Sequence, residues 1–372
     1  MTLSALWGLL DYPAWVGCGV ALAVAMLLVM TKHRHGHLSM DTQIGVQKFH
    51  TAPTPRIGGV AIYLGAVGAY LAAPAGYFHG LFGPLLLAGV PAFVFGLVED
   101  ITKRVSVRTR LLATMASGLV GWLITGHAIT DANVWGLDYL LGFTLVSVVF
   151  TAFAVGGVAN AINIIDGFNG LSGGTVIIAL AGLASISLQA QDYEVARLCG
   201  VLALVTLGFL LVNWPWGKLF LGDGGAYFLG FALAWVAVLI LARNPEVSAW
   251  APMLACGYPI LEVGFSIWRR KKRHMSPGDP DRLHLHSLVK RRVVRRLFPR
   301  ANNTVRNSLT GALMWSAALG TALLAARYSQ HTPSLLAATL FCAAVYSSIY
   351  ARLTQFRWCI SPATLKVVKR FA

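Results

Sequence analysis

The sequence predicts an all-α membrane protein that crosses the bilayer about eleven times. Of its 372 residues, 56% are hydrophobic and only 12% are charged, which is about half the charged share of an ordinary soluble domain. The mean hydropathy is +0.66. Apolar runs recur along the whole chain at roughly the 20-residue length that a helix needs to cross a bilayer. We therefore expect a single integral-membrane catalytic domain over residues 1–372, without a separate soluble domain.

These apolar runs define the predicted spans. Glycine and proline inside them, such as Gly65 and Pro259, are tolerated in membrane helices and permit close packing. No basic segment precedes the first run and no clear cleavage site follows it, so we expect a retained helix and not a signal peptide. The predicted spans are residues 13–30, 57–74, 81–98, 111–126, 139–158, 173–189, 197–213, 226–242, 250–267, 307–327 and 333–351.

The formal net charge of +16 is distributed unevenly. Of the 30 lysines and arginines, 27 lie in six segments on one side of an eleven-span path. Cytoplasmic connections retain such residues, so we expect the N-terminus outside and the C-terminus in the cytoplasm. The positive charge is then mainly topological, and we expect no nucleic-acid partner, because no aromatic platform or binding fold accompanies it. The six predicted cytoplasmic segments are residues 31–56, 99–110, 159–172, 214–225, 268–306 and 352–372.

The most informative stretch is NAINIIDGFNGLSGG, residues 160–174, between two long apolar runs. Asn160, Asn163 and Asp166 are three residues apart, so on a helix they cover an arc about 120° wide. The glycines that follow can end the helix and let the backbone approach a ligand. Polar atoms beside a bilayer need a partner or water. An ordinary loop is the alternative, but a loop has no need for such a ladder.

The first predicted cytoplasmic segment carries three basic or titratable residues near two prolines, Pro53 and Pro55, that stiffen the chain. A lysine, a histidine and an arginine held on a rigid turn suit a phosphate group. The alternative is the ordinary basic flank of a membrane helix. The three residues are Lys48, His50 and Arg56.

Two further segments place carboxylates at helix ends. Glu99 and Asp100 directly follow an apolar run, with Lys103 nearby. Adjacent carboxylates there can hold Mg²⁺ while a lysine contacts phosphate oxygens. The helix dipole disfavours acids at a C-terminus, so a solvated helix end does not explain them well. Asp223 lies among glycines before another apolar run. At that position we favour a metal ligand over a plain turn. The free N–H groups at the start of the following helix also suit an anion.

The fifth segment contains the histidines His284 and His286, which follow Arg282. No cysteine or further histidine nearby completes a zinc site, so phosphate contact or proton transfer is expected instead. Apolar residues recur every four positions among the basic residues that follow, which suggests a helix lying in the membrane interface. These apolar residues are Leu285, Val289, Val293 and Leu297.

Together these motifs resemble the polyprenyl-phosphate N-acetylhexosamine-1-phosphate transferase family. That family includes the bacterial enzymes that make undecaprenyl-diphosphate-GlcNAc and the phospho-N-acetylmuramoyl-pentapeptide transferase. The resemblance extends from Lys48 to His286 in the family's order, and residues 280–286, PDRLHLH, look closer to the GlcNAc-type branch. Three residues depart from the family pattern. Glu99 replaces the first of two aspartates, Asn169 stands where many members have an aspartate thought to contact uracil, and Ser287 replaces a histidine.

The resemblance implies that undecaprenyl phosphate attacks the β-phosphorus of a UDP-N-acetylhexosamine, with UDP-GlcNAc the first choice, and that UMP is released. A phosphomonoester has a second pKa of about 6, so the acceptor needs little deprotonation. The harder task is to bring two anions together, which Mg²⁺, or Mn²⁺ in its place, and nearby cations would do. We expect Asp223 to bind the metal and Asp100 to be a second metal contact or a base. The sugar and the polysaccharide pathway stay open.

The predicted site therefore combines two sets of residues. The predicted catalytic residues are Asp100, Asp166, Asp223, His284 and His286. The predicted substrate-binding residues are Lys48, His50, Arg56, Glu99, Lys103, Asn160, Asn163, Asn169 and Arg282. The resemblance also implies a bacterial inner membrane location, a cytoplasmic active site in contact with membrane lipid, and compatibility with a homodimer.

Two other classes of protein compete with this interpretation. A transporter needs ionisable groups near the bilayer midplane. Glu262 is the only carboxylate well inside a predicted span, and it lies in the cytoplasmic half. A non-catalytic scaffold would not require Asp100, Asp166 and Asp223. The gathering of the polar motifs on one side favours an enzyme that takes a soluble donor and a lipid acceptor.

Overall fold

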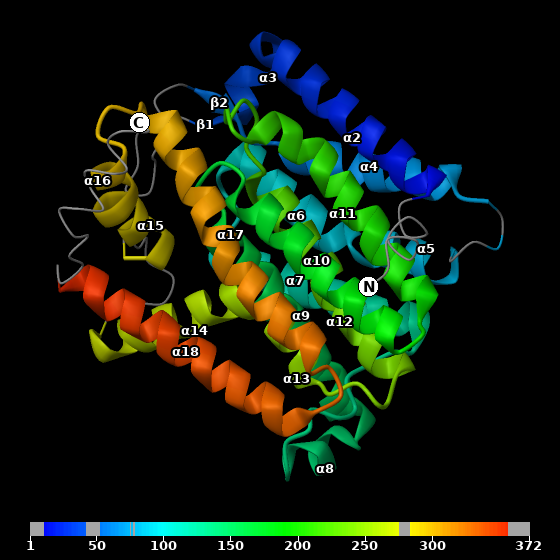
Figure 1. Ribbon diagram of the computed structural model, residues 1–372. Helices are drawn as coiled ribbons and strands as arrows, with labels where there is room; N and C mark the ends of the chain where they lie inside the picture. The colour runs from blue at the N-terminus through cyan, green and yellow to red at the C-terminus, as the bar shows by residue number, and fades with distance from the viewer. Residues whose placement is uncertain (1–10, 42–52, 75, 77–78, 275–282, 356–372) are drawn as a thin grey trace.

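The computed structural model describes residues 11–41, 53–74, 76, 79–274 and 283–355, most of which are helical (Figure 1). Lys48, His50 and Arg282 lie outside the described residues. The elements in chain order are α2 (Tyr12–Met30), α3 (Lys32–Ser39), β1 (Met40–Asp41), β2 (Thr54–Pro55), α4 (Gly58–Ala72), α5 (His79–Ala88), α6 (Val90–Thr102), α7 (Val107–Thr125), α8 (Leu137–Leu141), α9 (Thr144–Ile165), α10 (Leu171–Gln189), α11 (Tyr193–Asn213), α12 (Gly222–Arg243), α13 (Trp250–Ala255), α14 (Gly257–Lys272), α15 (Leu285–Val289), the π-helical turn η1 (Lys290–Val294), α16 (Arg295–Leu297), α17 (Asn303–Arg327) and α18 (Thr332–Thr354).

The predicted all-α membrane architecture is confirmed. Every predicted span falls on a helix or on a pair of helices, and eight stretches of the described chain are long and apolar enough to cross a bilayer. The spans predicted over residues 81–98 and 250–267 are each divided into two helices. Pro91 and Pro259 lack the backbone N–H that would continue the preceding turn. The number of crossings and their orientation stay predictions.

Helix α12 occupies the interior of the bundle (Figure 1). It packs against α4, α6, α9 and α10, and its side chains are buried along most of its length. A helix that is apolar on all sides fits either a protein core or a lipid environment, and the burial of α12 shows that other helices surround it here. Phe228, Phe231 and Trp235 are its largest fully buried side chains. The first turn of α12 is therefore held firmly by its neighbours.

Two glycines bring α4 and α6 into backbone contact with that first turn. A Cβ atom on Gly96 of α6 would lie 2.6 Å from the Cα atom of Gly224. A Cβ atom on Gly59 of α4 would lie 2.3 Å from the backbone nitrogen of Gly225. Neither approach leaves room for a side chain, so the beginning of α4 and the last turns of α6 meet the beginning of α12.

A short backbone ladder brings the residue before α4 to the same place. Strands β1 and β2 pair antiparallel, with Met40 opposite Pro55. The backbone N–H of Phe220 donates to the carbonyl of Pro55 (2.8 Å), and the N–H of Gly58 donates to the carbonyl of Phe220 (2.9 Å). These bonds hold Arg56 between the ladder and the residues that lead into α12.

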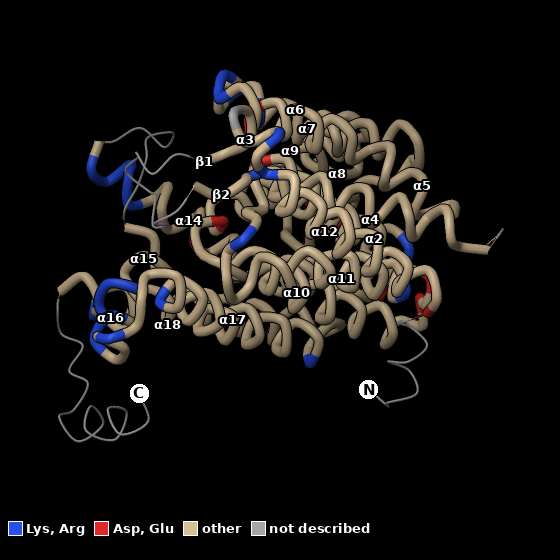
Figure 2. Tube along the Cα trace, turned by 90° about the horizontal axis from the view of Figure 1, so that it is seen from above, with Lys and Arg blue, Asp and Glu red and all other residues tan. Residues whose placement is uncertain are grey.

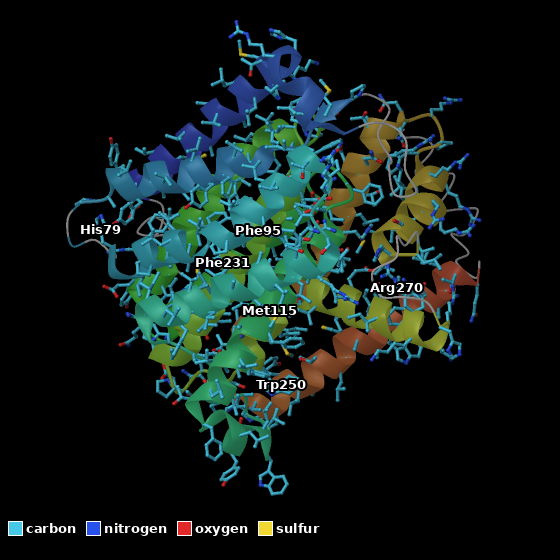
Figure 3. The ribbon with its side chains drawn as sticks, turned by 180° about the vertical axis from the view of Figure 1, so that it is seen from behind. His79, Phe95, Met115, Phe231, Trp250 and Arg270 are labelled. Atoms are coloured by element: carbon cyan, nitrogen blue, oxygen red, sulfur yellow. The ribbon has the colours of Figure 1, made fainter. Side chains whose placement is uncertain are left out.

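The basic segment α15–η1–α16 packs against α17 and α18 on one side of the molecule. Leu285 and Val289 of the predicted interfacial stripe are buried, and Val293 and Leu297 are half-buried. Helices of the protein itself therefore cover part of this stripe, and the prediction that the segment lies in the membrane interface stays a prediction. Figure 2 shows many lysines and arginines near α14 and α16. Arg270 of α14 is one of them, and in Figure 3 it lies on the opposite side of the molecule from His79 at the start of α5.

Candidate active site

Asp223 lies in the first turn of α12 and is almost fully buried. One carboxylate oxygen accepts a hydrogen bond from Arg56 Nη2, and the other accepts one from Arg110 Nη1. The sequence placed this residue in a loop, but α12 begins one residue earlier, at Gly222. At that position the N-terminal dipole of the helix adds to the attraction of the two guanidinium groups.

Asp100, in the last turn of α6, has no exposed surface. Its two oxygens accept the backbone N–H groups of Asp223 and Gly224, each at 2.9 Å. Arg56 Nε lies 3.4 Å from Oδ1. Asp100 therefore satisfies two of the unpaired N–H groups at the start of α12. This capping explains why an acid ends α6: the unfavourable dipole of its own helix is offset by the favourable end of another.

Asp166 follows directly after α9, and its Oδ1 accepts a hydrogen bond from the Ser172 hydroxyl (2.7 Å). Burial raises the pKa of Asp166 to about 6. The nearby Asp223 carboxylate adds to this rise, whereas the Ser172 hydroxyl and Arg56 oppose it. The structure thus brings Asp100, Asp166 and Asp223 together around Arg56, from the ends of three different helices.

Glu99 and Lys103 shape the turn between α6 and α7. Glu99 Oε2 accepts the backbone N–H of Val105 (2.8 Å), and Oε1 lies 3.9 Å from Arg110 Nη1. Lys103 adopts a left-handed backbone conformation (φ 56°), and its ammonium group donates to the Asp100 carbonyl. Glu99 therefore orients Arg110 in the site.

Sequence reasoning did not single out Arg110, although a signal was present. The helix dipole disfavours a base in the first turn of a helix, and Arg110 stands in the first turn of α7. Its Nε is buried and has no hydrogen-bond partner among the described residues. A buried guanidinium N–H without a partner is costly, so an anionic ligand would satisfy it.

The asparagine ladder of α9 connects neighbouring helices. Asn160 Nδ2 donates to the Gly156 carbonyl (2.8 Å) and to the Thr114 hydroxyl of α7 (3.2 Å). Asn163 Nδ2 donates to the Tyr227 hydroxyl of α12 (2.6 Å). Tyr227, one turn after Asp223, was also not predicted. These contacts hold α9 beside the start of α12, where Asp166 is needed.

Asn169 is buried, and its amide group lies at the turn before α12 and not at the carboxylates. Its Nδ2 lies 3.2 Å from the Ser308 hydroxyl and 3.4 Å from the Pro215 carbonyl. These contacts hold the turn that contains Pro215 against α17. The contact between Asn169 and uracil that the resemblance suggested stays a prediction.

The two histidines lie next to residues 166–168, the segment that includes Asp166 of the carboxylate cluster. The His284 and His286 rings stack at 5.3 Å with an interplanar angle of 12°. The His286 ring also packs edge-to-face on Phe168 (5.4 Å), and a Cβ atom on Gly167 would lie 3.6 Å from His286 Nε2. The histidine pair therefore lies beside the segment that carries Asp166.

Lys290 adds a further cation that the sequence analysis left among the general basic residues. Its ammonium nitrogen lies 5.2 Å from the centre of the Phe168 ring. Burial lowers the pKa of Lys290 to about 8, and the positive charge of Arg306 contributes. A buried ammonium group beside another cation favours an anion in the same place.

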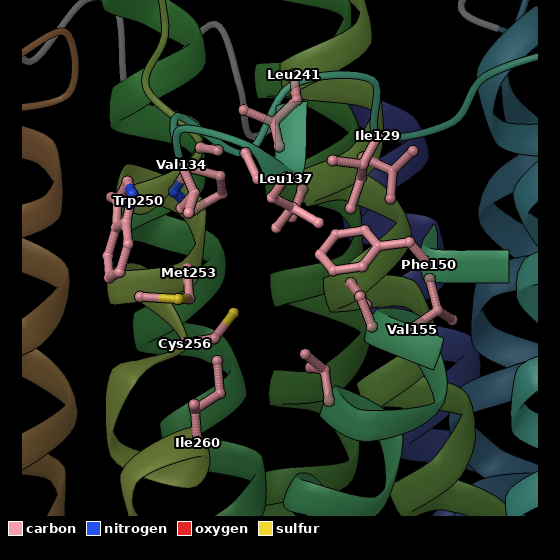
Figure 4. Close-up of a pocket in the computed structure, with 18 residues that line it drawn as sticks. Ile129, Val134, Leu137, Phe150, Val155, Leu241, Trp250, Met253, Cys256 and Ile260 are labelled. Atoms are coloured by element: carbon pink, nitrogen blue, oxygen red, sulfur yellow. The ribbon is translucent and has the colours of Figure 1, made fainter. Parts of the chain in front are cut away.

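An apolar cavity of about 270 Å³ lies between α9, α12 and α13–α14 (Figure 4). Phe150 and Val155 of α9, Leu241 of α12 and Met253 of α13 are among its lining residues. Leu241 is near the C-terminal end of α12, whereas Asp223 is at its N-terminal end. The cavity and the carboxylates are therefore at different levels of the bundle.

The acids suit a magnesium ion only with help from a ligand. Among the described residues, no three histidine, cysteine or acidic side chains form a metal-binding group. Each oxygen of Asp223 is already paired with a guanidinium group but keeps a second lone pair. Mg²⁺ in proteins is commonly bound by one or two carboxylates together with substrate phosphates. Asp223, with Asp166 nearby, fits that pattern.

The fold and site define a class of protein: a helical membrane protein in which carboxylates and partly exposed arginines gather at one end of the bundle. Residues 82–241, which include Asp100, Asp166 and Asp223, match the model of glycosyl transferase family 4. Over these residues the chain is similar to this family, which supports the resemblance that its motifs show.

Curated relatives show a similarity of the same kind. The chain is 29% identical over 241 residues to a probable undecaprenyl-phosphate N-acetylglucosaminyl 1-phosphate transferase of Bacillus subtilis, a match that covers 64% of this chain and 66% of that protein. It is 25% identical over 340 residues to the undecaprenyl-phosphate alpha-N-acetylglucosaminyl 1-phosphate transferase of Escherichia coli, covering 87% and 86% of the two chains. The enzyme of the same name from Salmonella typhi is 25% identical over 334 residues, covering 87% and 86%.

Proposed function

We propose that this protein transfers a sugar 1-phosphate, with GlcNAc 1-phosphate the first candidate, from a UDP-N-acetylhexosamine to undecaprenyl phosphate. The products are an undecaprenyl-diphosphate-linked sugar and UMP. The observation that carries the proposal is the meeting of Asp100, Asp166 and Asp223 with two arginines at one end of the bundle. The names of the relatives supply the acceptor and the sugar class.

The reaction joins two anions, so charge neutralisation is the main requirement. A phosphate oxygen of the acceptor attacks the β-phosphorus of the donor, and the bond between that phosphorus and the bridging oxygen of UMP breaks. Arg56 and Arg110 contact Asp223 on both sides and face the same space. The unpartnered Nε of Arg110 would donate to a phosphate oxygen of the substrate.

Asp223 would hold the metal ion, together with the phosphates of the donor. When bound, Mg²⁺ supplies charge neutralisation and alignment of the two phosphate groups. Asp100 accepts two N–H groups of the α12 backbone, so we assign it to positioning Asp223. Asn163 and Asp166 would hold the nucleotide sugar from α9, and the stacked histidines would contact its phosphates.

The acceptor also needs a place for its isoprenoid tail. The apolar cavity between α9 and α13–α14 would offer such a place, since apolar side chains line it (Figure 4). Part of the tail would lie there, and its phosphate would reach the carboxylates. The reaction would then take place at the inner face of a bacterial plasma membrane, where UDP-sugars are available.

The test measures UMP release by purified protein from UDP-GlcNAc, undecaprenyl phosphate and Mg²⁺. Asp223→Ala should lower turnover by about 100- to 1,000-fold, the scale at which a preorganised electrostatic contact acts. Glu246→Ala changes an exposed acid in the predicted outer connection between α12 and α13 and serves as the control. No UMP release from any UDP-N-acetylhexosamine in a donor panel would refute the proposed activity. Undiminished turnover by Asp223→Ala would refute the metal assignment.

A further inference from the structure

The carboxylate of Glu262 is a buried acid for which the proposed chemistry has no direct use. It lies in α14, has no exposed surface, and accepts a hydrogen bond at Oε1 from His284 Nδ1 (2.9 Å). The backbone N–H of Leu285 lies 3.3 Å from Oε1 and 3.2 Å from Oε2. A buried carboxylate is stable only when such donors surround it.

Two further residues of α14 contact the same short segment. Ser266 Oγ lies 3.3 Å from His284 Nδ1. Arg269 Nη1 donates to the carbonyl of Leu283 (3.0 Å) and to the hydroxyl of Tyr350 (3.0 Å). Glu262, Ser266 and Arg269 are four and three residues apart, which puts them on one face of the helix. This face therefore holds the backbone on both sides of His284 as well as its ring.

The contact with Glu262 also fixes the chemical state of one ring nitrogen. An ionised carboxylate only accepts hydrogen bonds, so Nδ1 of His284 carries a proton. The other nitrogen, Nε2, is then the one that can take part in reversible contacts. Because His284 stacks on His286, and His286 lies beside Gly167, the orientation set in α14 reaches the segment that carries Asp166.

From these contacts we propose that Glu262 is a positioning residue, which orients His284 and through it the histidine pair toward the phosphates of the nucleotide-sugar donor. The inference rests on the proposed function. The inference also bears on the transporter alternative. Glu262, the acid inside the predicted span, is hydrogen-bonded to a histidine and a backbone N–H, which is not the arrangement expected of an acid that lines the path of a transported ion.

The experiment combines Glu262→Gln with His284→Ala in single and double variants. A glutamine keeps the size of the side chain but removes the charge and replaces one acceptor oxygen with an N–H donor. Glu262→Gln should lower kcat/KM for the UDP-sugar by about tenfold or more, as loss of a supporting hydrogen bond typically does. The KM for undecaprenyl phosphate should not change, because the histidines are assigned to the donor. Glu194→Gln, the same change at an exposed acid in the first turn of α11 that pairs with Arg243, is the control.

The double variant separates positioning from a general structural role. If Glu262 acts through His284, adding Glu262→Gln to His284→Ala should cause little further loss. The same comparison is made for the binding of UDP-GlcNAc by calorimetry, which needs no turnover. Additive losses in both measurements, or wild-type kinetics for Glu262→Gln, would overturn the proposal. Failure of the unmodified protein to transfer any sugar would instead overturn the proposed function. The calorimetric comparison of UDP-GlcNAc binding by the single and double variants would still test the role of Glu262.

Discussion

At the scale of single residues, the site shows two adjacent acids with different tasks. Glu99 closes the turn after α6 and approaches Arg110, whereas Asp100 reaches across to the first N–H groups of α12. The second task depends on both oxygens of a carboxylate, since each accepts a different N–H. Asp223 then projects from a helix end whose position Asp100 has fixed.

Replacing Asp100 by asparagine tests this division of roles. One of the two N–H groups would face an amide N–H, and an unsatisfied buried donor costs about 1–3 kcal/mol. We expect a lower thermal midpoint and a turnover per folded molecule reduced by about tenfold or more, because Asp223 loses its orientation. Asp138→Asn is the matched control, since both Asp138 oxygens accept backbone N–H groups at 2.8 Å in another connection. Asp138→Asn should lower stability alone. Equal turnover by both variants would contradict the positioning role.

The raised pKa of Asp166 predicts a pH dependence. Folding raises it from 3.8 to about 6, so the protonated carboxyl is the form that the fold favours. Its contribution to stability is complete below pH 3.8 and is lost as pH rises through about 6. Activity should run the opposite way if the ionised form holds the donor and metal. We expect kcat/KM to rise with pH through about 6, and Asp166→Asn to remove that rise. A flat profile between pH 5 and 7 in the unmodified protein would contradict the assignment.

At the scale of secondary-structure elements, the site depends on how closely helix ends approach one another. The crossings at Gly59 and Gly96 place two other backbones against the first turn of α12. Membrane helices associate through packing and hydrogen bonds, because lipid is as apolar as their side chains. Small residues at the crossings therefore matter more than further hydrophobic surface.

Gly96→Ala tests the crossing between α6 and α12. The added Cβ atom would lie 2.6 Å from Gly224 Cα, so the helices must move apart. Overpacking of this kind costs about 1–3 kcal/mol, and the movement would separate Asp100 from the N–H groups it caps. We expect a lower thermal midpoint together with lost turnover. Gly157→Ala on α9, where a Cβ atom meets nothing within 4 Å, should leave both unchanged or raise stability slightly. Similar behaviour of the two variants would refute the argument.

At the scale of the whole molecule, the arrangement of charge predicts its orientation. Lysines and arginines gather near α14 and α16, at the side where the carboxylates also lie (Figure 2). Such residues are retained in the cytoplasm during insertion, so this side should face inward. A cytoplasmic site would meet UDP-sugars and the phosphate of a membrane lipid at the same interface.

Cysteine labelling in intact cells tests the orientation. Trp135, before α8, is fully exposed, and Arg295, in α16, is also exposed. Trp135→Cys should react with a membrane-impermeant maleimide from outside, whereas Arg295→Cys should react only after the membrane is opened. The unmodified chain sets the background from its own cysteines. The reverse pattern of labelling would invert the predicted orientation.

The sequence alone determined the membrane class and the positions of the apolar runs, and it singled out the three acids that the structure brings together. These properties follow from composition and local spacing: a bilayer requires long apolar helices, and Asn160, Asn163 and Asp166 share a face wherever their helix lies. Local spacing also gave the family resemblance, which the match of residues 82–241 to the family model supports.

The tertiary structure decided which helix ends meet. The cap that Asp100 forms on α12, the reach of Arg110 to Asp223 and the pairing of Glu262 with His284 join residues 22 to 123 positions apart in the chain. The interior stripe of α15 and the divided helices α5–α6 and α13–α14 also emerged only there. Helical periodicity fixes the face of a helix on which a residue lies. Which other helix that face contacts depends on the packing of the whole bundle. In this bundle a few close glycine contacts set the positions of the charged groups to within ångströms.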